Sequence, residues 1–159
     1  MSADSVSALV AALAGRTYSL SSPYEVSREK LREFAVAVGE AHPVFHESDA
    51  AVAAGFSDVV APPTFPIVVT FKVLQLLLAD PDLAIDLRRV VHGDQRFVTH
   101  SRLCAGDVVD CATAVSNVRT LGGNVMVSTT SELTRVGQPG VAAVRAEATL
   151  LIAAGATSG

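Results

Sequence analysis

The sequence contains no tryptophan, and aromatic residues make up only 5% of its 159 residues. Half of the residues are nevertheless hydrophobic, so valine, alanine and leucine must fill most of the core. A chain of this length suits a single domain, since domains most often have about 100–150 residues. The composition therefore predicts one globular domain with a largely aliphatic core.

Cysteine, positive charge and long apolar runs are also scarce. The spacing of the two cysteines, Cys104 and Cys111, matches neither a CxxC motif nor a zinc site, which argues against a disulfide scaffold and favours a reducing, cytoplasmic location. The net charge of −4 gives no indication of binding to nucleic acid or to an anionic membrane surface. No uninterrupted run of about 18 apolar residues is present, so we expect no membrane span.

The two ends of the chain are expected to lie outside the main domain. Residues 1–15 are rich in alanine, and Asp4 stands where a signal peptide would carry basic residues. We therefore expect an N-terminal helix or frayed tail over 1–15, the domain over 16–152 and a disordered tail over 153–159.

The rest of the chain is organised around the apolar stretch Val59–Ala79. Thr64 is the expected N-cap of a helix there, and Pro66 falls in its first turn, where a missing N–H costs little. Beyond Pro66 only three polar residues interrupt the run, namely Thr70, Lys72 and Gln75. A helix that is apolar nearly all round is expected to be buried nearly all round, which requires a sheet wrapped around it. Its N-terminus directs free amides at whatever lies there.

Shorter helices precede this stretch. Apolar residues at helical spacing predict a helix over Ser27–Val38, capped by Ser27 and ended by Gly39. A loop over Gly39–Asp49 follows and contains two of the four histidines. A second short helix is expected over Ala50–Ala54, with Ser48 or Asp49 as its cap.

The second half of the chain reads as strands separated by turns. Strands are predicted over Arg88–His100, with a bulge at Gly93, and then over Val108–Val118, Val125–Thr134 and Val141–Ile152. Helices followed by an antiparallel meander indicate the α+β class.

Several segments resemble one family, the MaoC-like hydratase/dehydratase N-terminal, or FAS1-like dehydratase, hot-dog proteins. They are Tyr24–Ala35, Ala41–Pro43, Val60–Phe65, Val91–Phe97 and Ala105–Asp107. The family includes subunits of two-component (3R)-hydroxyacyl-carrier-protein dehydratases. The resemblance implies a single hot-dog fold, in which an antiparallel sheet wraps a long central helix. It also implies a homodimer, or a heterodimer with another hot-dog subunit, acting on acyl-carrier-protein or coenzyme-A thioesters without a cofactor or metal.

Catalytic members of the family carry a loop Gly-Asp-x-Asn-Pro-(Ile/Leu)-His, in which Asp and His are the acid/base pair. Gly39 and Pro43 match this loop, Glu40 stands at the Asp position, and Phe45 stands where the His belongs. His46 follows one residue late. Non-catalytic subunits of the two-component enzymes also lose the histidine at this point, so the resemblance supports either a catalytic or a partner role.

The chemistry of dehydration sets the candidate site. A proton must leave the carbon next to the thioester carbonyl, the departing hydroxyl must be protonated, and the enolate oxygen must be stabilised. Glu40 is the candidate carboxylate, with His46 or His42 as the imidazole. The amide of Thr64 or Phe65 can stabilise the oxygen. The candidate substrate-binding residues are Phe45, Pro63, Thr64, Phe65 and Phe71.

Two functional hypotheses remain open from the sequence. The first is an (R)-specific dehydratase/hydratase, or one subunit of it. The second is a non-catalytic hot-dog partner that binds the acyl chain and stabilises a catalytic subunit. His42 can instead simply hydrogen-bond its own loop, and His92 either sets the strand register or lines an acyl tunnel or dimer seam. A metal site at His42, His46 and Glu47 matches no zinc spacing.

Overall fold

The computed structural model describes residues 3–153. Its sheet is antiparallel throughout, with strand order β1-β4-β5-β6-β3 and β2 also paired to β4. The strands are β1 Thr17–Ser19, β2 Tyr24–Glu25, β3 Val90–Thr99, β4 Val108–Leu121, β5 Asn124–Arg135 and β6 Ala142–Ile152. The helices are α1 Ala3–Leu13, α2 Arg28–Ala37, α3 Ser48–Ala53 and α4 Pro66–Leu78, with 3₁₀ turns η1 Pro43–Phe45 and η2 Leu87–Arg89.

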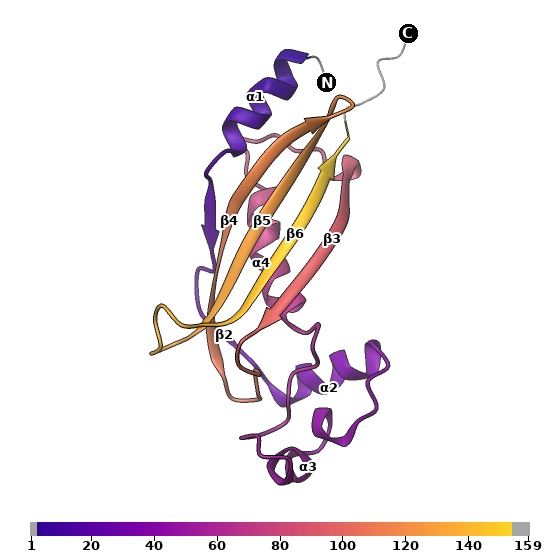
Figure 1. Ribbon diagram of the computed structural model, residues 1–159, viewed down its shortest axis with the longest axis vertical. Helices are drawn as coiled ribbons and strands as arrows, with labels where there is room; N and C mark the ends of the chain where they lie inside the picture. Colours follow the sequence, from indigo (N-terminus) through magenta and orange to yellow (C-terminus); the bar gives the residue numbers. More distant parts are fainter. Residues whose placement is uncertain (1–2, 154–159) are drawn as a thin grey trace.

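The arrangement confirms the predicted α+β hot-dog fold, but the expected meander of all four long strands is wrong: it holds for β4, β5 and β6, whereas β3 pairs with β6 rather than with β4. Helix α4 runs along one face of the curved sheet, while α1 lies at one end of the molecule and α2 and α3 lie at the other (Figure 1). Among residues 3–153, no helix is both long and apolar enough to cross a membrane. Of the tail predicted over 153–159, all but Ala153 lies outside the described residues.

Local sequence signals located the strand irregularities only in part. The predicted bulge is confirmed, because the pairing of β3 with β6 shifts between His92 and Asp94. The β4–β5 hairpin closes on Gly122 and Gly123, whose φ angles of +57° and +81° suit a turn that glycine adopts without strain. Two further shifts, between Val115 and Asn117 in the β4–β5 pairing and between Leu133 and Thr134 in the β5–β6 pairing, were not predicted.

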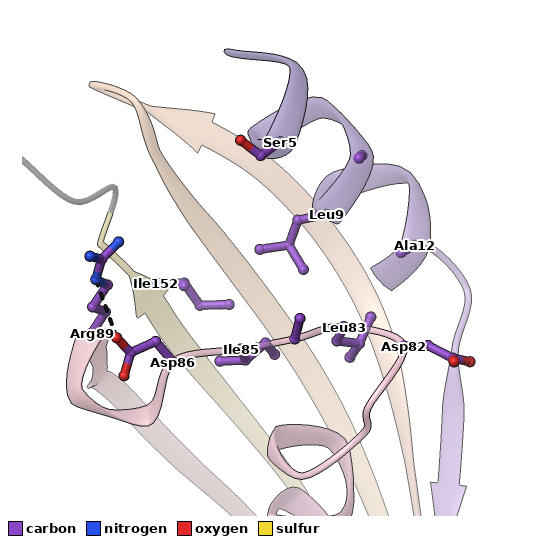
Figure 2. A pocket seen from close by; sticks show the side chains of 11 residues that line it. Ser5, Leu9, Ala12, Asp82, Leu83, Ile85, Asp86, Arg89 and Ile152 are labelled. Atoms are coloured by element: carbon purple, nitrogen blue, oxygen red, sulfur yellow. Dashed lines mark ion pairs between the residues drawn. The ribbon is translucent and has the colours of Figure 1, made fainter. Parts of the chain in front are cut away.

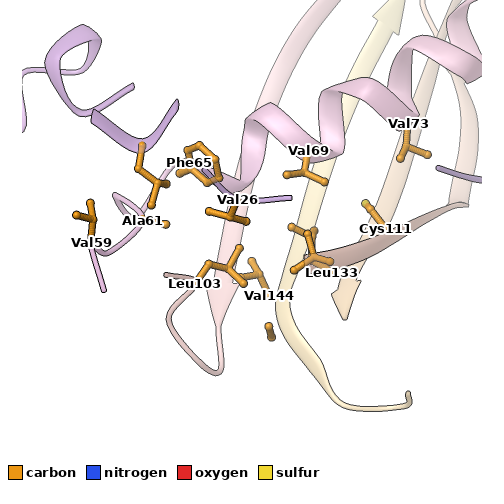
Figure 3. Packing of buried hydrophobic residues seen from close by; sticks show 13 residues of the cluster. Val26, Val59, Ala61, Phe65, Val69, Val73, Leu103, Cys111, Leu133 and Val144 are labelled. Atoms are coloured by element: carbon orange, nitrogen blue, oxygen red, sulfur yellow. The ribbon is translucent and has the colours of Figure 1, made fainter. Parts of the chain in front are cut away.

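The core lies between α4 and the sheet. Val69 and Val73 point from α4 toward Cys111 and Leu133 on the strands (Figure 3). A second cluster joins α1 to the far end of α4 and includes Leu9, Leu13, Leu74, Leu77, Val127 and Leu150. Burial raises the pKa of the Cys111 thiol to about 12, so it is not a nucleophile at neutral pH.

Helix α2 has the ends that its sequence predicts. The Ser27 hydroxyl accepts a hydrogen bond from the Lys30 amide at 3.3 Å. At the other end Gly39 has a φ of +75°, and the Glu40 amide donates to the Ala35 carbonyl at 2.8 Å. This is a Schellman cap, and it fixes the direction in which the following loop leaves the helix.

The start of α4 differs from the prediction. Thr64 is not the N-cap; Phe65 occupies that position with helical angles and makes no side-chain capping bond. The chain enters through tight 3₁₀ bonds, from the Phe65 amide to the Pro62 carbonyl at 2.9 Å and from the Ile67 amide to the Thr64 carbonyl at 3.1 Å. Because these bonds already wind the backbone, Thr64 lacks the extended geometry that a capping residue needs.

Two further expectations about helices are wrong. Helix α3 begins at Ser48, and Glu47 rather than Ser48 or Asp49 holds the N-cap position, without a side-chain capping bond. Helix α4 is not buried all round, since Phe71 is 43% exposed and Leu76 is 45% exposed. The sheet of a single chain covers only one side of α4, which leaves an open face.

Candidate functional site

The loop that contains Glu40 and His46 lies against the segment that leads into α4. The Val60 amide donates to the Val44 carbonyl at 3.0 Å. The Phe45 ring is half-buried and packs against a cluster that contains Ala51, Val60 and Cys104. These contacts place the loop at the N-terminal end of α4, beside α2 and α3 (Figure 1).

The loop brings His46 to Glu40 although the histidine stands one residue late. The Nε2–H of His46 donates to the backbone carbonyl of Glu40 at 2.6 Å, because a carbonyl oxygen can only accept. The His46 carbonyl in turn accepts a hydrogen bond from Arg32 Nε at 2.7 Å. Both side chains are half-buried, and the Glu40 carboxylate has no hydrogen-bond or ion-pair partner within residues 3–153.

His42 has a structural role in the loop. Its Nδ1 accepts a hydrogen bond from the Val44 amide at 3.3 Å and so caps η1. The exposed ring also lies edge-on to Phe45, with 6.2 Å between ring centroids. The loop-bonding alternative for His42 is confirmed, and among the described residues His42 makes no hydrogen bond to Glu40.

The start of α4 offers fewer free amides than the sequence suggested. The expectation for the Phe65 amide is wrong, because that group already donates to Pro62. The Phe65 ring is fully buried and lies edge-on to Phe34 at 5.5 Å. Pro63 and Thr64 are exposed, and within the described chain the Thr64 amide has no hydrogen-bond partner. Thr64 is therefore the remaining candidate for stabilising an oxyanion.

Phe71 lies between two hollows on the open side of α4. The hollow on the β3 side has a volume of about 430 Å³, and we call it the β3-side hollow. Its mostly apolar lining is Phe71, Leu74, Gln75, Leu78, Ala79, Leu87, Val90, His92 and Leu150. The other, of about 440 Å³, we call the lysine hollow; it is lined by Tyr24, Lys30, Ile67, Val68, Phe71, Lys72 and Gln75.

The hollows contain residues that sequence reasoning missed. Lys72 and Gln75 break the apolar run of α4 and lie three residues apart, so they share one face of the helix. That interruption was the available signal for a surface that is not part of the core. His92 both borders the bulge and lines the β3-side hollow, so its two alternative roles are compatible.

A third hollow, of about 430 Å³, lies at the opposite end of the molecule from the Glu40 loop. Leu9 of α1 projects toward Leu83, Ile85 and Ile152, and the ion pair of Arg89 with Asp86 lies at the rim (Figure 2). None of the predicted site residues lines it.

An ion pair fastens α2 to the approach to α4. Arg28 Nε donates to the two carboxylate oxygens of Asp58 at 2.9 and 3.1 Å, and Nη2 donates at 2.6 Å. This pairing, with a further hydrogen bond from the Val59 amide, lowers the pKa of Asp58 to about 2. The Arg28–Asp58 ion pair therefore fixes α2 relative to the segment that precedes α4, and the loop that contains Glu40 and His46 packs against this segment. Within residues 3–153, no cluster of three His, Cys, Asp or Glu side chains is arranged to hold a metal ion.

The fold and this arrangement define a hot-dog protein of the dehydratase type. A family model for the FAS1-like dehydratase domain region matches residues 12–144, and the chain belongs to that family. Among its relatives are UPF0336 proteins of Leifsonia xyli subsp. xyli, 48% identical over 141 residues (89% of this chain and 93% of the relative), and of Thermobifida fusca, 48% identical over 119 residues (75% and 78%).

Solved structures agree with this membership. The chain resembles a subunit of the C-terminally truncated HadBC (3R-hydroxyacyl-ACP dehydratase) complex from Mycobacterium tuberculosis, with a TM-score of 0.78, 31% identity and coverage of 87% of this chain and 96% of that one. A MaoC-like dehydratase matches with a TM-score of 0.80 and 27% identity over 89% of this chain and 42% of its own. The (R)-hydratase from A. caviae, at 17% identity and a TM-score of 0.66 over 86% of this chain and 93% of its own, shares the fold.

Proposed function

We propose that this chain is a subunit of an (R)-specific 3-hydroxyacyl-thioester dehydratase/hydratase, and that the acyl chain of the substrate binds along the open face of α4. The observation that carries the proposal is Phe71, an apolar side chain that is 43% exposed and lies between two hollows on the open face of α4. The 31% identity to a subunit of a structure described as a (3R)-hydroxyacyl-ACP dehydratase supports the same reaction class.

The β3-side hollow suits the acyl chain. Leu74, Leu78 and Leu150 line it together with Phe71, and each methylene group moved from water to such a surface is favourable by about 0.8 kcal/mol. The surface is concave and mostly apolar, with Gln75 and His92 as polar groups at its margin, which is typical of small-molecule sites.

A second hot-dog subunit completes the enzyme in this proposal. Strand β3 is an edge of the sheet, paired only with β6 among the described strands, and an exposed strand edge is suited to pairing with another chain. In this version the partner supplies the principal acid/base pair. In this chain Phe45 stands at the position of the family's catalytic histidine, and its ring packs against the cluster of Ala51, Val60 and Cys104. Removal of the α-proton and the 3-hydroxyl group as one molecule of water changes no oxidation state, so the proposed reaction needs an acid/base pair but no redox cofactor and no metal. Two buried free cysteines are compatible with the cytoplasmic location that we also propose.

The self-sufficient enzyme is a second candidate, favoured by the contact of His46 with Glu40. The unpartnered Glu40 carboxylate would take the α-proton, the imidazolium form of His46 would give its Nδ1 proton to the leaving hydroxyl, and water would depart as the double bond forms. The Thr64 amide would donate to the enolate oxygen at the positive end of α4. In this version the bond from His46 to the Glu40 carbonyl sets the orientation of the imidazole.

An assay of the hydration of crotonyl and longer enoyl thioesters tests both versions. The reaction is monitored through the loss of absorbance of the α,β-unsaturated thioester. The protein is assayed alone and after co-purification with a hot-dog subunit that carries an intact Asp…His loop, with Glu40→Gln and His46→Ala beside wild type. We expect activity only with the partner, abolished by substitutions in the partner's loop. Activity of the protein alone that both variants lose would establish the second candidate, and inactivity in every combination would contradict both.

A further inference from the structure

The lysine hollow gathers all the lysines of the chain. The sequence has 12 lysine and arginine residues, but only Lys30 and Lys72 are lysines, and both line this one hollow. They come from different elements, α2 and α4, and Tyr24 of β2 joins them. Two ammonium groups on one concavity stand out in a chain whose net charge is −4.

The surroundings keep both ammonium groups available. Lys72 Nζ lies 5.9 Å from the centre of the Tyr24 ring, a cation–π contact that holds it over the hollow. Lys30 Nζ pairs with Glu33 at 2.8 Å, but the two side chains are 42% and 69% exposed, and such exposed pairs contribute little. Burial raises the pKa of Tyr24, so its phenol keeps the proton that a hydrogen-bond donor needs.

These groups specify the chemistry of a ligand. Two cations and a phenolic O–H suit a doubly negative phosphate ester, which has several acceptor oxygens. The apolar side chains of Ile67, Val68 and Phe71 beside them suit an organic arm rather than a free ion. We propose that the lysine hollow binds the phosphate of the 4′-phosphopantetheine arm that carries the thioester, whether on coenzyme A or on a carrier protein.

The proposal rests on the proposed function for the identity of the carrier, and the geometry connects the two sites. Ile67 and Val68 lie in the first turn of α4, three and four residues after Thr64 and its free amide. Lys30 lies in the first turn of α2, and the helix rises about 10 Å from Lys30 to its last residue, Ala37, shortly before Glu40. An extended pantetheine arm spans a distance of this order, so in the self-sufficient version of the enzyme the phosphate and the thioester can occupy the two positions together.

Calorimetric titration with 4′-phosphopantetheine at low salt tests the subsite without any turnover, and pantetheine lacking the phosphate is the control ligand. We expect Lys30→Gln and Lys72→Gln each to weaken binding about tenfold, and added salt to weaken it further. Glu33→Gln should tighten binding about twofold to threefold, because it removes the competing carboxylate. Arg119→Gln removes an exposed cation from β4 without touching the hollow, and it should leave the affinity unchanged.

Several results would overturn the subsite. They are equal affinity for pantetheine, absence of binding to phosphopantetheine, lysine variants that bind like wild type, and an equal loss in Arg119→Gln. Thermal melts of each variant identify any that fail to fold, and Glu33→Gln, whose effect has the opposite sign, is not mimicked by unfolding. Repeating the titration with coenzyme A and with a phosphopantetheinylated carrier protein shows which source binds through the lysines, and dependence in either supports the proposal.

The subsite and the proposed function can fail separately. Lysine-dependent binding in a protein that is inactive with every partner would leave the subsite standing and remove the dehydratase assignment. An active enzyme whose lysine variants keep the wild-type KM would support the dehydratase assignment and remove the phosphate subsite.

Discussion

Asp58 joins two parts of the chain that frame the candidate site. Its folded pKa of about 2 lies below the ordinary value of about 3.9 for an aspartate. A lowered pKa means that the ionised form is favoured in the folded protein, so the stabilisation is present above about pH 4. It is lost as the pH falls from about 4 to about 2, because the folded state then has to take up the proton.

Asp58→Asn should therefore lower the Tm at pH 7 by about 2–4 °C, since an ion pair at the surface contributes modestly. The difference from wild type should disappear as the pH approaches 2, as followed by thermal melts across this range. Asp110→Asn serves as the control, because that exposed carboxylate has no ion-pair partner among residues 3–153. A deficit that persists at pH 2 would show that packing at Asp58, rather than its charge, is responsible.

Single residues also show which parts of the site the sequence can specify. Ser27 and Gly39 were predictable because a cap depends on a few neighbouring backbone groups. The hydrogen bond from His46 to the Glu40 carbonyl was not predictable, because it depends on how the 3₁₀ turn η1 reverses the direction of the chain. The prediction of Thr64 as the N-cap of α4 was wrong for a related reason. Three prolines within five residues removed backbone amides and favoured a 3₁₀ entry to the helix.

Among the elements, α4 presents two phenylalanines to different surroundings. Phe65 is fully buried, whereas Phe71 stands on the open face between the hollows. Phe65→Ala should cost about 3–5 kcal/mol of unfolding free energy, as large-to-small changes in a core do. Phe71→Ala should cost less than about 2 kcal/mol, because the ring is only partly covered in the free chain.

The same pair separates folding from substrate binding. With the completed enzyme, Phe71→Ala should weaken binding of a long-chain 3-hydroxyacyl thioester about tenfold and affect crotonyl thioester much less, since only the long chain reaches the β3-side hollow. Denaturant unfolding and titration measure the two effects. An equal loss for short and long substrates would remove Phe71 from the acyl site.

The character of α4 was predicted better than its environment. Its near-continuous apolar surface indicated a central helix correctly, but the inference of complete burial assumed that one chain supplies all the cover. Periodicity reports how much of a helix prefers to avoid water, and it does not say whether the cover comes from the same chain, a ligand or a second chain. Phe71 and Leu76 mark the part that this sheet leaves uncovered.

At the scale of the whole molecule, strand order determines where a partner can add. The sheet ends at β3, whose exposed Val91 lies in the segment that resembles the family. If a second subunit extends the sheet there, the outward amides of β3 gain hydrogen bonds. Hydrogen exchange should then slow in the peptide covering 90–99 when the partner is added, while the paired interior of β4 and β5 changes little. Protection confined to α1 or to the β4–β5 hairpin would place the interface elsewhere.

Fold class was accessible from the sequence because the order of helices and strands leaves few arrangements for so apolar a helix. The pairing of β3 with β6 was not, because those strands are far apart in the chain and similar in character. The two hollows beside Phe71 form only because β3 pairs with β6 and because β2 passes near α4. In the sequence, only Lys72 and Gln75, which interrupt the apolar run of α4, indicated such a surface.

The composition of the lysine hollow also makes it easy to address chemically. Every ε-amino group of the chain lies there, so an amine-directed acylating reagent modifies no side chain outside this concavity. The absence of tryptophan adds an optical counterpart, since emission excited in the tyrosine absorption band, where phenylalanine does not absorb, comes only from Tyr18 and Tyr24. Tyr24 lies beneath Lys72 in the same hollow, which gives the unmodified protein a native fluorophore at this position.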